Sequence, residues 1–276
     1  MIAKRRRIEE NLKIESVPTY DGDCSSERDL KLVSGSLYLP KENELKPKGD
    51  DSHFICQKEG VIGVADGVGG WALKGIDAGE YARRLMKNCY VAVKKGEIDL
   101  KRVLGEAYAY TKVAGSSTAC LLSLSDSKLH AINVGDSGFM VLRRGRVVYQ
   151  SPLQQHRFNH PYQLGNSNAS DTPSCAQELE FQTRAGDIIV MATDGLLDNV
   201  FPWEVELAVW YRLWVHEQDG DDLIPEEIAY DLAEIAMYNS LDHFAETPFS
   251  IAAKQAGKER RGGKVDDITV IVSFVI

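Results

Sequence analysis

Cysteine is scarce and is not arranged for a disulfide framework or a zinc site. The 276-residue sequence contains five cysteines, and no two of them form a Cys-x-x-Cys pair. An odd number of widely spaced thiols argues against paired disulfides and for a reducing compartment. None of the six histidines forms a His-Glu-x-x-His motif or a similar pair. We therefore expect neither a disulfide scaffold nor a zinc centre.

Long apolar runs are also absent. No stretch approaches the roughly 18 residues that a membrane-spanning helix needs, so we expect no transmembrane segment. The opening segment, "MIAKRRRIEENLK", lacks an apolar core, which excludes a secretory signal. Its basic run from Lys4 to Arg7 is compatible with the start of an amphipathic targeting segment, and equally with a solvated basic end.

Positive charge is in deficit. The chain has 32 Lys and Arg against 41 Asp and Glu, which gives a formal net charge of −9. Such a chain repels nucleic-acid phosphates, so we expect no nucleic-acid partner, whereas the same excess of acid suits a protein that binds cations. Hydrophobic residues make up 43% of the sequence, which is enough for a sizeable core.

The pattern along the chain predicts one domain behind a short tail. Residues 1–32 are polar and weakly patterned, so we expect a tail there and a single domain over residues 33–276. Residues 151–180 and 241–264 lack periodicity and are polar or charged, which indicates loops. Apolar residues at helical spacing predict four helices, over residues 76–96, 100–111, 203–216 and 225–240.

The β-branched runs predict two antiparallel sheets. "KLVSGSLYLP" indicates a first strand, "HFICQ" and "VIGVAD" a hairpin, and the runs between Ser116 and Gln150 an antiparallel meander. "DIIVMAT" and "DDITVIVSFVI" add two buried strands. No linker separates two cores, so the best fit is one α+β domain of two packed antiparallel sheets with helices outside.

Aspartates recur at the ends of the predicted strands. A single Asp-Gly after a strand is usually only a turn, because both residues favour turn backbones. Several such turns beside buried apolar runs are harder to explain in that way, since strand ends from two sheets can converge. Clustered carboxylates repel one another unless cations neutralise them, so convergence predicts bound metal. The residues concerned are Asp50 and Asp51, Asp66 with Gly67, Asp136, Asp194 with Gly195, and Asp266 with Asp267.

The glycine after Asp66 has a specific use. Because Gly67 has no Cβ, its backbone carbonyl can turn toward a metal ion. Carboxylate and carbonyl oxygens are hard ligands, which select Mg²⁺ or Mn²⁺ over zinc. The sequence therefore predicts an oxygen-lined site for divalent cations around Asp66.

The chain carries, in this order, the segments "VADGVGG", "GSSTACLL", "NVGDSG", "ATDGLLDN" and "GGKVDDITV". In order and separation they resemble the type 2C metal-dependent protein phosphatases, over about residues 34 to 276. The segments "DGVGGW", "LQQHRFNHPYQLG" and "ATDGLLDNVF" are most similar to the mitochondrial branch of that family. The resemblance implies an αββα sandwich, in which two packed antiparallel sheets are flanked by helices.

The resemblance also implies roles for the central aspartates. Asp66 would bridge two metal ions, and the Gly67 carbonyl would bind one of them. Asp194 and Asp266 would complete the shell of the second ion, so the expected catalytic residues are Asp66, Asp194 and Asp266. The implied cofactor is Mg²⁺ or Mn²⁺, two ions per site, which activate a water for in-line attack on the phosphorus.

Four further aspartates are assigned supporting roles by the same resemblance. Asp50 would act on a metal ion through bound water, with Asp51 nearby. Asp136 would help Asp194 to hold a third, weaker metal ion. Asp267 stands where the family usually has Asn, and we expect it to support the ligands without touching the metal.

Two departures from the family pattern affect the phosphate site. Val68 stands where the family often has a histidine that is proposed as general acid, and the usual arginine before the first acidic pair is missing. Lys46 and Lys48 are the nearest cations, and we take them as candidate phosphate-binding residues; the alternative is that both are solvated loop residues. Cysteine chemistry does not replace the metal mechanism, because no Cys-x5-Arg motif occurs.

We therefore expect a protein serine/threonine phosphatase that hydrolyses phosphomonoesters with a metal-activated water. The alternatives are a catalytically weak scaffold, suggested by the missing His and Arg, and a phosphohydrolase of small molecules. The expected partners are phosphorylated proteins, and the expected oligomeric state is a monomer. The resemblance to one branch points to mitochondria; otherwise we expect the cytoplasm.

Overall fold

Two five-stranded antiparallel sheets form the centre of the structure, a computed structural model that describes residues 30–42, 48–168, 170–219 and 222–276. The predicted tail lies outside these ranges except for its end, where Leu32 already begins the first strand. The first sheet has the order β12 (Gln177–Gln182), β6 (Lys128–Val134), β5 (Ala119–Ser125), β3 (Val61–Asp66), β2 (Asp51–Cys56). The second has the order β1 (Leu32–Leu39), β14 (Ile268–Val275), β13 (Ile188–Ala192), β7 (Gly138–Arg143), β8 (Arg146–Gln150).

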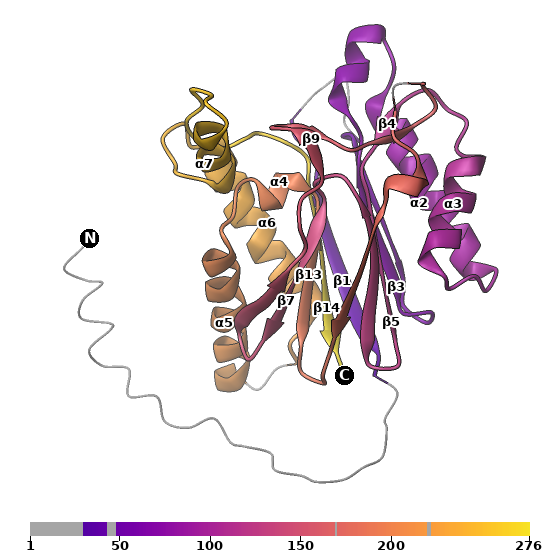
Figure 1. Cartoon of the computed structure of the whole chain (residues 1–276). Helices are drawn as coiled ribbons and strands as arrows, with labels where there is room; N and C mark the ends of the chain where they lie inside the picture. Colours follow the sequence, from indigo (N-terminus) through magenta and orange to yellow (C-terminus); the bar gives the residue numbers. More distant parts are fainter. Residues whose placement is uncertain (1–29, 43–47, 169, 220–221) are drawn as a thin grey trace.

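Helices cover the outer face of each sheet (Figure 1). Two helices, α2 (Ala78–Lys94) and α3 (Leu100–Tyr110), pack on the first sheet, and two others, α5 (Pro202–Asp219) and α6 (Pro225–Leu241), pack on the second. These layers confirm the predicted αββα sandwich. The remaining elements are short: η1 (Gly69–Lys74), β4 (Ser116–Ser117), β9 (Gln155–Arg157), β10 (His160–Pro161), β11 (Leu164–Gly165), η2 (Pro173–Cys175), α4 (Asp194–Leu197) and α7 (Pro248–Gln255).

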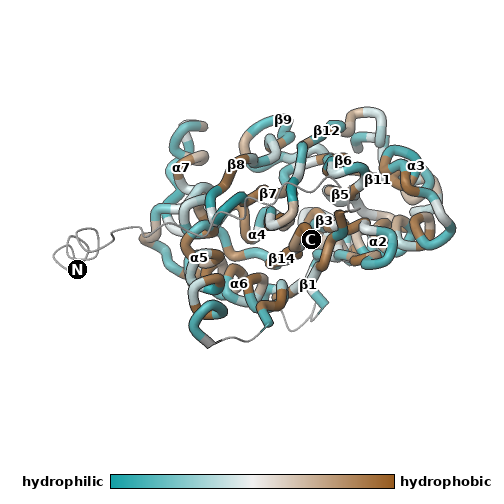
Figure 2. The backbone as a smooth tube through the Cα atoms, turned by 90° about the horizontal axis from the view of Figure 1, so that it is seen from below, coloured by the Kyte–Doolittle hydropathy of each residue, from teal (hydrophilic) through white to brown (hydrophobic). Residues whose placement is uncertain are grey.

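Three apolar layers hold the sandwich together. Leu85 and Leu121 belong to the layer between the first sheet and its helices, and Val190 and Leu232 to the layer between the second sheet and its helices. Between the sheets, strands alternate so that side chains such as Phe139 face the opposite sheet. Figure 2 shows hydrophobic segments gathered there when the sandwich is seen from below. Each such fully buried side chain contributes roughly 1.5–3 kcal/mol relative to exposure.

The predicted meander does not stay in one sheet. Strands β5 and β6 belong to the first sheet, whereas β7 and β8 belong to the second. The turn Gly135-Asp136-Ser137 carries the chain from one sheet to the other between β6 and β7, and Gly135 has a φ of 108° there. This crossing places Asp136 at the junction of the two sheets.

Several of the shorter elements were not predicted, among them β12 and α7. Strand β12 lies in the segment read as a loop, because "QELEFQ" alternates half-buried and exposed residues on an edge strand and is rich in charged and amide side chains. Helix α7 lies in the second predicted loop, where Thr247 and Ser250 form a capping box at its start. In the described part of the chain, no helix is both long and apolar enough to cross a membrane.

Candidate metal centre

The predicted aspartates meet at one end of the sandwich, where strands of both sheets end. Asp51 and Asp66 lie directly opposite each other on the neighbouring strands β2 and β3. Asp194 follows β13 in the other sheet, and Asp267 precedes β14. The side chains of Asp51, Asp194 and Asp267 are buried, and that of Asp66 is partly buried. Charges that are normally solvated are thus confined to one small region.

Asp51 ties the two sheets together. Its Oδ2 accepts hydrogen bonds from the hydroxyls of Thr193 (2.8 Å) and Thr269 (2.7 Å), which both belong to the second sheet's side of the site. Its Oδ1 is buried and has no hydrogen-bond partner. Burial, followed by the nearby charge of Asp267, raises the pKa of Asp51 well above its usual range. The carboxylate form of this residue therefore lacks a compensating cation on one side.

Asp267 holds the segment that carries Asp50. Its Oδ2 accepts from the Asp50 backbone amide (3.2 Å), and its Oδ1 accepts from the Lys41 amide (3.0 Å) and the Tyr38 hydroxyl (3.3 Å). Gly67 donates its amide to the Asp50 carbonyl at 3.1 Å, which brings the Asp50 backbone against the turn after β3. Asp267 thus restrains the backbone of Asp50, which is buried beside it.

Asp66 stands at the tip of β3 on a turn with no room for a larger residue. The Thr118 hydroxyl accepts a hydrogen bond from the Asp66 amide at 3.0 Å, which fixes the backbone there. A Cβ on Gly67 would lie 2.5 Å from the carbonyl oxygens of Asp50 and Ala78, so only glycine fits. Burial, followed by the charges of neighbouring aspartates, first of all Asp194, raises the pKa of Asp66 well above its usual range.

Two lysines that the sequence reading missed enter this acidic cluster. The Lys41 ammonium lies 2.8 Å from Asp266 Oδ1, 3.1 Å from Asp267 Oδ2 and 3.6 Å from Asp50 Oδ2. The Lys264 ammonium contacts Asp194 Oδ2 and lies 3.3 Å from Asp266 Oδ2. Although burial favours the protonated carboxyl, these two lysines hold the pKa of Asp266 below its ordinary value.

Asp136 and Asp198 form the far end of the cluster. Asp136 Oδ2 accepts from the Gln155 amide at 2.9 Å, while its Oδ1 is buried without a partner. Burial, followed by the charge of Asp194, raises the pKa of Asp136 to about 7. Asp198 was not singled out from the sequence; one turn of α4 after Asp194 brings it to the Lys264 ammonium at 3.0 Å. Burial raises the pKa of Asp198 to about 7 as well.

The residues fit divalent cations by their donor chemistry. Three carboxylate oxygens, Asp51 Oδ1, Asp136 Oδ1 and Asp194 Oδ1, are buried without a hydrogen-bond partner, and buried unpaired oxygens of this kind are costly unless a cation compensates them. All the donors are hard oxygens, the type that Mg²⁺ and Mn²⁺ select. Among the described residues, no three carboxylate, imidazole or thiol side chains already enclose a metal-sized space. Between the carboxylates stand the two ammonium groups instead.

Among the described residues, no ion pair joins Lys48, one of the two candidate phosphate-binding lysines, to the cluster. Lys48 is exposed, and its backbone carbonyl accepts a hydrogen bond from the Tyr38 hydroxyl at 2.8 Å. Lys46 lies outside the described residues. Val68, which replaces the expected histidine, donates its amide to the Ser116 carbonyl at 3.0 Å and has no titratable side chain.

Comparison with known proteins shows which family shares this arrangement of motifs and fold. No protein-family model matches the chain. The probable protein phosphatase 2C 55 of Arabidopsis thaliana is 49% identical over 249 residues, which are 89% of this chain and 52% of that protein. The protein phosphatase PTC7 homolog of Danio rerio is 38% identical over 273 residues, and the match covers 90% of each chain.

Solved structures give the same result. The photosystem II phosphatase PBCP superposes with a TM-score of 0.80 at 31% identity, covering 89% of this chain and 99% of that one. The catalytic domain of the phosphatase PstP, solved with two manganese ions, shares the fold with a TM-score of 0.62 at 18% identity, covering 90% and 99%.

The chain belongs to the type 2C family of metal-dependent protein phosphatases. Within that family, its match to the zebrafish PTC7 homolog runs over nearly the whole of both chains. It spans about half the length of the Arabidopsis relative. The family resemblance read from the five sequence motifs is therefore confirmed.

Proposed function

We propose that this chain hydrolyses phosphoserine and phosphothreonine in proteins at a centre of two divalent cations, Mg²⁺ or Mn²⁺. The observation that carries the proposal is the convergence of aspartates from both sheets, with buried oxygens that lack partners. Asp66, the Gly67 carbonyl, Asp194 and Asp266 would hold the cations, and Asp50 would act through water. Asp66, Asp194 and Asp266 are the proposed catalytic residues.

A bound pair of divalent cations supplies an acidified water and neutralises charge on the phosphoryl oxygens. The chain's own contribution is to fix the oxygens that hold them. Thr118 restrains the backbone of Asp66, and Asp267 restrains that of Asp50, so neither ligand has to be ordered when substrate binds. Val68 cannot protonate the leaving oxygen, so that proton comes from water or from another residue.

The phosphate group needs cations on the chain as well. Lys41 is the described lysine that reaches the Asp50 side of the cluster, with its side chain 28% exposed. We propose Lys41 as a phosphate contact beside Lys46 and Lys48. Replacing each lysine in turn with alanine should raise the KM for a phosphopeptide where that lysine binds phosphate. Unchanged kinetics in a variant would remove that lysine from the site.

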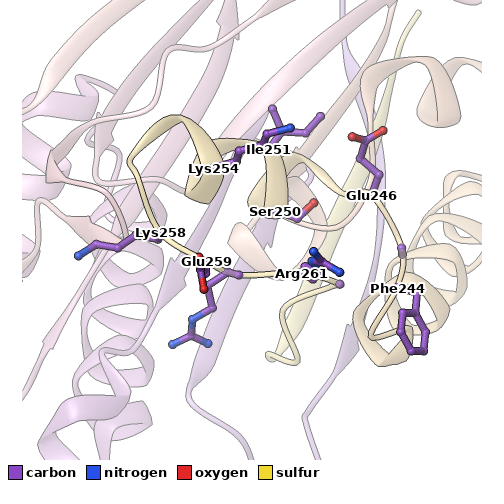
Figure 3. A pocket seen from close by; sticks show the side chains of 11 residues that line it. Phe244, Glu246, Ser250, Ile251, Lys254, Lys258, Glu259 and Arg261 are labelled. Atoms are coloured by element: carbon purple, nitrogen blue, oxygen red, sulfur yellow. The ribbon is translucent and has the colours of Figure 1, made fainter.

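A basic hollow on the surface suits acidic phosphoproteins. It has a volume of about 810 Å³ and lies on the segment around α7, where Lys254, Lys258 and Arg261 surround it (Figure 3). Two acidic residues, Glu246 and Glu259, also line it, so the positive charges are in excess. We propose that this hollow receives acidic residues that flank the phosphorylated side chain.

The direct test is turnover of p-nitrophenyl phosphate and of a phosphothreonine peptide with Mn²⁺, Mg²⁺ or EDTA. We expect turnover with either metal and none with EDTA. Asp66→Asn should abolish metal binding and activity together while the circular dichroism spectrum is unchanged. Turnover in EDTA would contradict the metal mechanism, and full activity of Asp66→Asn would contradict the role of Asp66.

A catalytically weak scaffold is the second candidate, favoured by Val68 and by the two lysines within the acidic cluster. Absence of turnover with every metal, together with intact folding, would select it. Turnover of small phosphate esters but not of phosphopeptides would instead indicate a small-molecule phosphohydrolase.

The remaining proposals concern organisation and location. We propose a single phosphatase domain over residues 33–276 that acts as a monomer and has no nucleic-acid partner. Mitochondrial location is proposed from the similarity to PTC7 homologs; the basic run Lys4–Arg7 that bears on it lies outside the described residues. Fractionation of cells that express the full chain would test the location.

A further inference from the structure

Lys264 reaches into the acidic cluster from the loop before β14. Its ammonium contacts Asp194 Oδ2 and lies 3.0 Å from Asp198 Oδ2 and 3.3 Å from Asp266 Oδ2. Three carboxylates around one cationic centre resemble the oxygen surroundings of a bound cation rather than those of a surface ion pair. The side chain is only 17% exposed, so water cannot easily replace these contacts.

Hydrogen bonds hold the backbone of Lys264 in place next to the cluster. The fully buried Asn199 accepts from the Lys264 amide at 2.8 Å and donates to the Lys264 carbonyl at 2.8 Å. The Phe249 ring lies 5.7 Å from the ammonium, and the Phe249 amide donates to the Asp198 carbonyl at 2.9 Å. Both anchors tie Lys264 to the segment that carries Asp198.

The charge balance agrees with a permanent cation at this position. The Lys264 ammonium faces three carboxylates, those of Asp194, Asp198 and Asp266, so the negative charges beside it exceed its own positive charge. One oxygen of Asp194 is committed to the ammonium, while its Oδ1 remains buried without a partner. Asp194 can therefore serve the ammonium and a metal ion with different oxygens.

We propose that the Lys264 ammonium is the resident cation at the Asp136–Asp194–Asp198 end of the cluster, so that this end takes up no third metal ion. The inference rests on the proposed two-cation centre, whose ions belong to the other end, around Asp66. The ammonium neutralises carboxylates that would otherwise repel one another, and it keeps this end of the cluster ordered before any metal ion binds.

The test counts bound Mn²⁺ on the full chain by isothermal titration calorimetry and electron paramagnetic resonance. Wild type should bind two ions, Lys264→Met three, and Lys264→Arg, which keeps the charge, two. Lys258→Met, which removes an exposed lysine from the same loop, should also bind two. In EDTA, Lys264→Met should unfold at a lower temperature than wild type, and Mn²⁺ should restore it.

Three ions in wild type or in Lys264→Arg would overturn the inference, as would two in a folded Lys264→Met. Should Lys264→Met fail to fold, the count in Lys264→Arg and wild type still decides. Absence of Mn²⁺ binding in every protein would instead refute the metal centre itself, so the two failures are distinguishable.

A separate feature is the outward face of α5. Trp203, Leu207, Trp210 and Trp214 lie along it at helical spacing, and each is 47–56% exposed. The opposite face of the same helix packs into the core through residues such as Val209. A helix that is apolar on both faces is usually covered on both, so this outer stripe indicates an interaction surface.

A groove of about 720 Å³ runs between this stripe and α6, and its charged lining residues are all acidic. They are Glu204, Asp231 and Glu234, of which Asp231 is paired with Arg212. A second copy of the chain would place these carboxylates against their own equivalents, which repel. We propose that the groove binds an amphipathic helix of a partner protein, with apolar side chains on one face and Lys or Arg on the rim.

The probe is a synthetic amphipathic peptide with leucines on one face and lysines elsewhere, measured by fluorescence anisotropy with the full chain. It should bind at least about 10-fold more tightly than the same peptide with Glu for Lys. Trp210→Ala should lose about 10-fold or more in affinity, and Ile98→Ala, an exposed apolar residue beside α3, should lose none.

Equal binding of the two peptides, or unchanged binding to Trp210→Ala, would overturn this proposal. Two other occupants would also overturn it. A dimer in analytical ultracentrifugation that Trp210→Ala dissociates would assign the groove to a second copy. Tighter peptide binding after Lys4–Arg7 is replaced by alanines would assign it to the chain's own first residues.

Discussion

The most informative single substitution is Asn199→Ala. The Asn199 side chain is fully buried and makes three hydrogen bonds: to the Gly195 carbonyl (2.9 Å), to the Lys264 carbonyl (2.8 Å) and from the Lys264 amide (2.8 Å). It joins the turn after β13 to the loop before β14, and these segments carry Asp194, Asp198, Asp266 and Asp267 of the acidic cluster. Alanine keeps the backbone but removes all three bonds.

The expected loss of stability follows from those bonds. A typical hydrogen bond contributes about 1 kcal/mol net, and a buried polar group that loses its partner costs about 1–3 kcal/mol. Since Asn199→Ala leaves buried backbone groups without partners, we expect the free energy of unfolding to fall by about 3–5 kcal/mol. The freed loop should also position Lys264 and Asp266 less well, so affinity for Mn²⁺ should fall.

Urea unfolding of the full chain, followed by circular dichroism, measures the first effect, and calorimetric titration with Mn²⁺ the second. Gln182→Ala is the matched control, because this exposed amide makes one hydrogen bond, to the Ser127 carbonyl at 2.9 Å. The control should change stability by less than about 0.5 kcal/mol. A loss below about 1 kcal/mol for Asn199→Ala would refute the reasoning, since it would mean that the clamp contributes no more than one ordinary bond.

Three further predictions concern the same end of the sandwich. Gly67→Ala should destabilise the fold by about 2 kcal/mol or more in urea unfolding, because its Cβ would lie 2.5 Å from two backbone carbonyls; wild-type stability would contradict this. Thr193→Val should cost about 1–3 kcal/mol in the same assay by removing a donor to Asp51, and a neutral result would mean that Thr269 suffices. In EDTA, the melting temperature should fall as pH rises from about 4 to 7, because the pKa values of Asp136 and Asp198, about 7, exceed the ordinary 3.8, so the folded state holds more protons there. Mn²⁺ should weaken that fall, and a rise across this window would contradict it.

Most of the fold could be predicted from the sequence, because strands and helices of the core carry regular apolar patterns. The predicted helix over residues 225–240 is α6 (Pro225–Leu241), and the last predicted strand contains β14 (Ile268–Val275). The division of the meander between two sheets could not be predicted, since nothing local distinguishes the turn at Asp136 from a hairpin turn. Strand order is decided by packing that joins distant segments.

The residues of the candidate site also fall into those that the sequence pattern indicates and those that it does not. Strand-end aspartates such as Asp66 were visible because several of them recur beside buried apolar runs, whereas any one of them alone is more often a plain turn. Lys41 and Lys264 were not, because a lysine in a charged loop is ordinary until the fold brings it among carboxylates. A signal for Asp198 was present, since "DGLLD" places two aspartates four residues apart, on one side of a helical turn.

The buried thiols have a consequence for oxidative conditions. Among the described cysteines, Cys56, Cys89 and Cys120 are buried, and burial raises the pKa of each thiol above its ordinary value. Cys175 is half-buried, and none of the four contacts the acidic cluster. Peroxide reacts with thiolates, so these thiols should react with it only slowly. The proposed phosphate-ester hydrolysis, which is built on carboxylates, should therefore continue in peroxide at levels that inactivate thiolate-dependent phosphatases, and a cell under oxidative stress would keep it while losing theirs.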